Sequence, residues 1–209
     1  MKPIARLRYL AASTLIALSL VAGQAFARPQ PLQITVFVHQ DVSASTDALY
    51  NTYLEHWEKA MNEISGREVI FEYITEANAI TTLNYQHEDV TVPLREMSKL
   101  FGWHGKAHPK QGHGSLQKGL LLTQHPINDV AGGVAEDRGD VGIASLVSYN
   151  FPAHELGHMF GATHENATGG WSSLCDTYMM PQRNAFKAHC YAYSEANEDL
   201  LGNILIKLH

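Results

Sequence analysis

The chain has 209 residues, and its 21 Asp and Glu outnumber its 15 Lys and Arg, which gives a formal net charge of −6 at pH 7. This acidic balance, without any run of basic residues, argues against a nucleic-acid partner. The hydrophobic fraction of 45% is typical of a globular chain, and the length suits one ordinary domain.

The first 27 residues have the pattern of a secretory signal peptide. A basic start precedes an apolar run from about Leu10 to Val21, and Ala25-Phe26-Ala27 then offers a small-x-small cleavage site. The apolar run is shorter than the roughly 20 residues of a membrane span. We therefore expect residues 1–27 to be removed and residues 28–209 to be secreted or periplasmic, without a membrane contact. An uncleaved N-terminal anchor is the alternative.

The chain has two cysteines, Cys175 and Cys190. Because the signal pattern places the protein in an oxidising compartment, we expect them to form a disulfide rather than two thiols.

The mature chain is predicted to begin with a strand, a long helix and a second strand. Residues 33–38 (QITVFV) and 68–75 (EVIFEYIT) are rich in β-formers. Between them, apolar residues recur at helical spacing from Ser45, a plausible N-cap, to Gly66, a plausible stop. The predicted apolar face consists of Leu49, Tyr53, Trp57, Met61 and Ile64. This order predicts a crossover that joins two parallel strands.

A second helix is predicted over residues 92–101 (VPLREMSKLF), followed by a segment rich in Gly, His and Lys. Its three histidines, His104, His108 and His113, raise the alternative of a metal site. The intervening Gly and Pro prevent helical pairing of these histidines, and no carboxylate or cysteine lies nearby. We therefore expect an exposed polar loop.

Three further strands are predicted over residues 119–124, 130–135 and 140–148, with glycines weakening the middle one. A final helix is predicted from Ser194, its expected N-cap, to the end of the chain. Its apolar face consists of Leu200, Leu201, Ile204, Leu205 and Leu208. We expect this face to pack on the domain rather than to bind a partner.

The most informative stretch is AHELGHMFGATHEN, residues 153–166. His154 and His158 are four apart, so on a helix both imidazoles lie on one face and reach one ion. Asn150 is a candidate cap for this helix, and Pro152 is tolerated in its first turn. Glu155 lies beside the first histidine, where it reaches a metal-bound water without being a ligand.

His164 explains the glycine in this stretch. A continued helix would carry His164 about 15 Å along the axis from His154, whereas zinc–nitrogen bonds of about 2.0–2.1 Å require the ligands to converge. The helix must therefore end, and Gly161 accepts the left-handed conformation that ends helices. The alternatives are an ordinary pair of helical histidines and a structural zinc site closed by a fourth protein ligand. The carboxylate beside three histidines favours a catalytic zinc site.

The sequence HELGHMFGATHE resembles the long zinc motif of the metzincin metallopeptidases, H-E-x-x-H-x-x-G-x-x-H. A metzincin also has a methionine-containing turn under the histidines. Met179, two residues before Pro181, resembles the methionine of that turn, with Met180 as the alternative. The order of predicted strands before the motif is similar to that of the adamalysin (reprolysin) branch.

This resemblance implies an α/β (α+β) fold with a twisted mixed sheet, an antiparallel edge strand and long helices above a zinc cleft. The small, mostly irregular C-terminal subdomain would end in a helix. The catalytic domain would divide into an upper part, about residues 28–161, and a lower part, about residues 162–209. Residues 181–187 would line the pocket for the side chain after the cleaved bond.

The expected function is that of an exported zinc endopeptidase with one Zn²⁺ bound by His154, His158 and His164. Glu155 would activate the zinc-bound water. The expected partner is a protein or peptide in extended form along the edge strand near residues 130–135, and the protein is expected to be a monomer. The alternative is a catalytically silent zinc-containing peptide-binding protein of the same fold.

Overall fold

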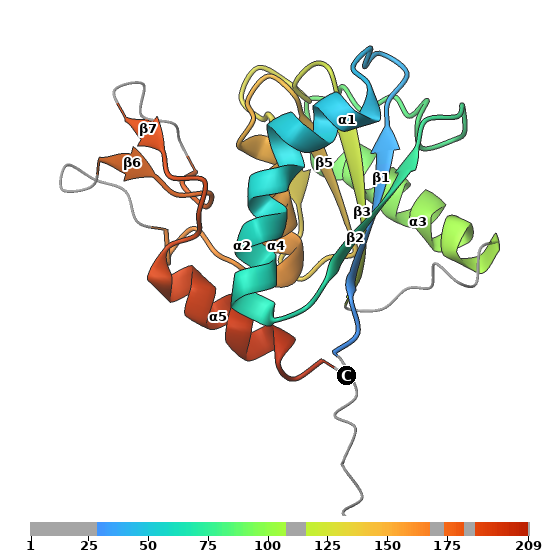
Figure 1. Ribbon diagram of the computed structural model, residues 1–209. Helices are drawn as coiled ribbons and strands as arrows, with labels where there is room; N and C mark the ends of the chain where they lie inside the picture. Colours follow the sequence, from blue (N-terminus) through green and yellow to red (C-terminus); the bar gives the residue numbers. More distant parts are fainter. Residues whose placement is uncertain (1–28, 108–115, 168–173, 182–186, 209) are drawn as a thin grey trace, which may run out of the picture.

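A five-stranded mixed sheet organises the protein (Figure 1). The computed structural model describes residues 29–107, 116–167, 174–181 and 187–208, so the expected signal segment lies outside the described residues. The strand order is β2-β1-β3-β5-β4, and only β4 at the edge is antiparallel to its neighbour. The strands are β1 (Leu32–Val38), β2 (Val69–Ile74), β3 (Gln117–Thr123), β4 (Gly133–Ala135) and β5 (Val141–Ser145).

Helices cover both faces of the sheet because its central strands carry apolar side chains on both sides. Ile34 and Val36 of β1 share one core cluster with Trp57, whereas the next residue, Phe37, packs edge-on against Phe101 on the opposite face. The first face is covered by α2 (Glu55–Ser65) and α4 (Phe151–Phe160), and the second by α3 (Thr91–Ala107) (Figure 1). The predicted parallel pairing of the first two strands is confirmed.

The predicted helix over residues 45–65 contains an unexpected π-helical turn. Ser45 caps α1 (Thr46–Leu49) by accepting a hydrogen bond from the backbone N–H of Ala48, and α2 ends at Gly66, whose φ is 64°. Between α1 and α2, η1 (Tyr50–Leu54) is π-helical. Its wider turn places Leu54 in the core, five residues after Leu49. Tyr53, which was predicted on the apolar face, is only partly buried. Its hydroxyl donates to the carbonyl oxygen of Leu146 at 3.0 Å.

The helix predicted to end at Phe101 continues as α3 to Ala107, so the loop prediction is wrong for residues 102–107. His104 lies on this helix, with its ring 5.4 Å from that of Phe37 and stacked on that of Phe101 at 6.4 Å. These contacts extend the apolar face by one turn. His108 and His113 lie outside the described residues.

The C-terminal part forms a short parallel pair, β6 (Cys175–Asp176) and β7 (Ala188–His189), and then α5 (Glu195–Leu205). Ser194 caps α5 as predicted by accepting from the backbone N–H of Asn197, and Leu201 and Leu205 are buried. The expected fold class, with its antiparallel edge strand and closing helix, is confirmed. The division into two subdomains stays a prediction. None of the described helices is long and apolar enough to span a membrane.

Candidate functional site

Helix α4 carries the HELGH stretch and ends where the sequence predicts. Pro152 lies in its first turn. Gly161 at its C-terminus has a φ of 100°, so the helix ends there and the chain changes direction. Asn150 occupies the expected N-cap position, but its side chain makes no capping hydrogen bond. Its Nδ2 instead donates to the carbonyl oxygen of Tyr178 at 3.3 Å. Asn150 therefore links the start of α4 to the segment before Met179.

The turn at Gly161 brings the three histidines together. The Nε2 atoms of His154, His158 and His164 lie 3.0–3.2 Å from one another. The centre of a triangle of that size lies about 1.8 Å from each nitrogen, which is close to the 2.0–2.1 Å of zinc–nitrogen bonds. The three imidazoles therefore fit one metal ion.

A hydrogen bond at Nδ1 fixes the orientation of the His154 ring. Its Nδ1 lies 2.7 Å from the carbonyl oxygen of Tyr178, which only accepts, so Nδ1 carries the proton and Nε2 presents its lone pair. Burial lowers the pKa of His154 to about 4, with a smaller contribution from the charge of His158. Burial also lowers the pKa of His158. Neutral imidazoles are the form that binds metals.

Glu155 is 4% exposed and lies against the edge strand. A Cβ atom added to Gly133 of β4 would lie 2.5 Å from the Glu155 Oε1, so only glycine leaves room for the carboxylate. Burial raises the pKa of Glu155 well above its ordinary value. Within the described residues the carboxylate has no hydrogen-bond donor from the protein, and it lines the same cavity as His154 and His164. A buried carboxylate of raised pKa suits a group that takes up and releases a proton.

The two methionines after Tyr178 occupy different places. Met179 is fully buried below α4, where a Cβ atom added to Gly157 would lie 2.5 Å from its sulfur. Met180 lines the cavity instead. The position of Met179 is that of an apolar floor under the helix that carries the histidines, although its assignment to a methionine turn stays a prediction.

A cavity of about 560 Å³ is lined by His154, His164 and Glu155. Its upper side is formed by residues around β4, including Gly132, Gly133 and the exposed Val130, and Phe151 of α4 also lines it. Its lower side includes Pro181, the first of the residues expected to line a side-chain pocket. Residues 182–186 of that expected set lie outside the described residues.

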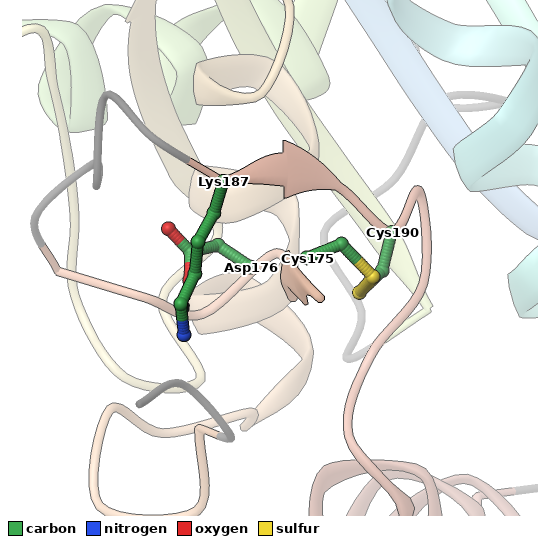
Figure 2. Close-up of a disulfide and its surroundings, with 4 residues drawn as sticks. All are labelled: Cys175, Asp176, Lys187 and Cys190. Carbon is green, nitrogen blue, oxygen red and sulfur yellow. Dashed lines mark ion pairs between the residues drawn. A yellow bond between two sulfur atoms is a disulfide. The ribbon is translucent and has the colours of Figure 1, made fainter. Parts of the chain in front are cut away.

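The sequence reasoning missed two polar residues of the cavity, Asp176 and His189. Each lies next to a cysteine of the Cys175–Cys190 disulfide, which is formed as predicted (Figure 2). Asp176 also makes an ion pair with Lys187, with 3.6 Å between Oδ1 and Nζ (Figure 2). The disulfide thus holds β6 and β7 together along the lower side of the cavity. Proximity to the two cysteines was the available sequence signal.

No protein-family model matches the sequence, and no curated protein matches it. Solved structures do match the fold. Metalloproteinase-II from Bacteroides fragilis is 12% identical with a TM-score of 0.59, over 86% of this chain and 54% of that protein. OgpA from Akkermansia muciniphila is 14% identical with a TM-score of 0.45, over 90% of this chain and 65% of that one. This chain therefore spans about half the length of metalloproteinase-II, and it has a metalloproteinase-like fold.

Proposed function

We propose that this protein is an exported zinc-dependent endopeptidase of the metzincin type. The observation that carries the proposal is the convergence of three Nε2 atoms beside a cavity that His154, His164 and the buried Glu155 line. The resemblance of residues 154–164 to the metzincin motif and the likeness in fold to metalloproteinase-II support it. The disulfide supports export, because disulfides persist in oxidising compartments.

In this proposal His154, His158 and His164 hold the zinc, and Glu155 moves the proton. The bound zinc supplies a water whose pKa is lowered towards about 7. The Glu155 carboxylate accepts a proton from the attacking water and then delivers it to the departing amine. The outer side of β4 offers backbone groups to an extended peptide, since β4 pairs with β5 on its other side.

The alternative function is that of a zinc-containing protein that binds peptides without cleaving them. It would retain the histidines and the open edge strand. Replacing Glu155 separates the two functions, because only the peptidase needs a proton-transferring group at that position.

The test measures metal content and peptide cleavage for the wild type, Glu155→Gln and the matched control Glu165→Gln, which alters an exposed glutamate beside His164. Purified protein is incubated with a diverse peptide mixture, with and without chelator, and products are identified by mass spectrometry. We expect Glu155→Gln to retain zinc while cleavage falls at least about 100-fold, and Glu165→Gln to remain active. Cleavage that is unchanged in Glu155→Gln, or in the chelated wild type, would refute the proposal.

A further inference from the structure

A second surface groove lies between α2 and α5, and the proposed reaction does not use it. Its volume of about 630 Å³ exceeds that of the cavity at the histidines. Two of its lining side chains are exposed and apolar in character: Tyr191 is 40% exposed and Ile206 is 75% exposed. We call this surface the α2–α5 groove.

A row of aromatic rings joins the α2–α5 groove to the cavity at the histidines. His189 lines that cavity, and its ring lies 4.5 Å from that of Tyr149. Tyr149 stacks on Tyr191 at 5.2 Å, and Tyr191 lies 4.5 Å from His56 on α2. Tyr191 and His56 both line the groove. An extended chain advances about 3.3 Å per residue, so the row spans on the order of four residues of peptide.

The backbone at Tyr191 has an unusual conformation. Its φ is 52°, which is uncommon for a residue with a bulky side chain. Tyr191 directly follows Cys190, so the disulfide anchors the chain next to this position. Such backbone strain concentrates at functional sites.

The charges around the α2–α5 groove are mainly negative. Glu63, Glu198 and Asp199 line it and make no ion pair with any described residue. Lys59 also lines the groove, but its ammonium is 2.6 Å from the carboxylate of Glu55. The groove therefore combines exposed apolar surface with unpaired carboxylates, and this combination suits a ligand that is both apolar and positively charged.

We propose that the α2–α5 groove binds a basic, apolar stretch of the polypeptide substrate, about four residues along the chain from the part held in the cavity. This inference rests on the proposed function. The aromatic row runs from His189 at the cavity to His56 at the groove, and its length is about that of four residues of extended peptide. The groove would thereby select substrates that carry Lys or Arg at a distance from the cleaved bond.

The test uses a short peptide that the enzyme cleaves, extended through a spacer of about four residues by a tail of alternating Lys and Leu or of alternating Gln and Leu. Each tail is placed in turn on either side of the cleaved bond. With the tail on one of the two sides, we expect kcat/KM for the Lys tail to be about tenfold higher than for the Gln tail at low salt, because KM is lower. This advantage should shrink at high salt.

In the double variant Glu198→Gln/Asp199→Asn, we expect the advantage of the Lys tail to fall below about twofold, while the short peptide is cleaved as before. The control Glu68→Gln/Glu96→Gln removes two carboxylates that do not line the groove, and it should retain the advantage. Equal cleavage of the two tails by the wild type would overturn the inference. So would an advantage that survives both Glu198→Gln/Asp199→Asn and Ile206→Ser.

Direct binding separates failure of the groove from failure of the peptidase. Fluorescence anisotropy would measure binding of each labelled tail, without the cleaved sequence, to the Glu155→Gln protein. If no peptide is cleaved but the Lys tail binds and the groove variants weaken it, the proposed function fails and the groove assignment stands. If peptides are cleaved but neither tail binds, the groove inference alone fails. Dimerisation that Ile206→Ser abolishes would assign the groove to a second copy and also overturn the inference.

Discussion

The Nδ1 atom of His154 lies 2.7 Å from the carbonyl oxygen of Tyr178, the residue before Met179. The side-chain amide of Asn150 donates to the same oxygen at 3.3 Å. One backbone carbonyl therefore fixes the ring of a candidate metal ligand and is itself fixed by a residue at the start of α4. The turn that carries Met179 is coupled in this way to the metal site.

Replacing Asn150 by Ala should weaken metal binding. The Tyr178 carbonyl would lose the donor that orients it, and outer hydrogen-bond partners of this kind contribute about 10-fold to 100-fold to metal affinity. We expect a loss near the lower end of that range, because the hydrogen bond from His154 remains. Competition against a chromogenic chelator measures the change. Asn51→Ala, at an exposed position of η1, is the control. Equal affinity of Asn150→Ala and the wild type would contradict the coupling.

Replacing Gly133 by Ala should abolish most activity while leaving the metal in place. The new Cβ would lie 2.5 Å from the Glu155 Oε1, so the carboxylate or the edge strand must move. We expect kcat to fall about 100-fold or more, because a displacement of about 1 Å at a reacting group has an effect of that size. Metal content, measured in parallel, should not change.

The matched control is Gly102→Ala in α3, where an added Cβ meets nothing within 4 Å. Because Ala favours a helix over Gly, this variant should be as active as the wild type and more stable by about 0.5–1 kcal/mol. Full activity of Gly133→Ala would show that β4 can move to accommodate the Cβ atom. The function of Glu155 would then not depend on its close contact with Gly133.

The core of the candidate site was predictable because it depends on local geometry. His154 and His158 share a helical face through a spacing of four, and Gly161 ends the helix so that His164 turns back. The parallel pairing of β1 and β2 also followed from local patterns, since an apolar strand, a helix and another strand favour a parallel crossover.

The features of the site and the fold that the sequence did not predict depend on contacts between distant segments. Asp176 and His189 enter the cavity only because β6 and β7 pair there, and no periodicity in the sequence marks them. The side chain of Asn150 can cap the backbone N–H groups at the start of α4 or donate to the Tyr178 carbonyl oxygen. Tertiary structure favours the second hydrogen bond. The π-helical turn η1 likewise reflects packing of Leu54 rather than any local signal.

Replacing Arg67 by Ala should destabilise the fold without altering the site. The Arg67 guanidinium is buried and donates to the carbonyl oxygens of Gln30 at 2.6 Å, of Leu205 at 3.0 Å and of Leu208. It thus joins the segment before β1 to the C-terminal end of α5. We expect a loss of about 3 kcal/mol, because three carbonyl groups lose a charged donor that is itself buried.

Urea unfolding measures this loss in the free energy of unfolding. Arg67→Lys should recover little of it, because an ammonium cannot reproduce the forked geometry of a guanidinium. The control Arg95→Ala removes an exposed arginine and should change stability by less than about 0.5 kcal/mol. A loss in Arg67→Ala no larger than that of the control would show that the three contacts do not stabilise the fold.

The buried Lys118 should make stability depend on alkaline pH. Its side chain is 2% exposed, with Nζ 3.3 Å from an oxygen of Asp140, and burial lowers its pKa while Asp140 partly opposes that effect. Between this lowered pKa and the ordinary value of 10.5, the unfolded chain binds more protons than the folded one. The contribution of Lys118 to the free energy of unfolding therefore rises with pH across that window.

Lys118→Met removes this contribution. Because Asp140 is half exposed, the substitution does not leave an unpaired charge in the interior. At neutral pH we expect the free energy of unfolding of the variant to equal that of the wild type or to exceed it by up to about 1 kcal/mol. This difference should decline as the pH approaches 10.5. Urea unfolding of both proteins across this pH range measures the difference, to which the shared tyrosines contribute equally. Lys99→Met, at an exposed position, should show no such trend. Parallel stability curves for Lys118→Met and the wild type would mean that the buried ammonium titrates as it does in water.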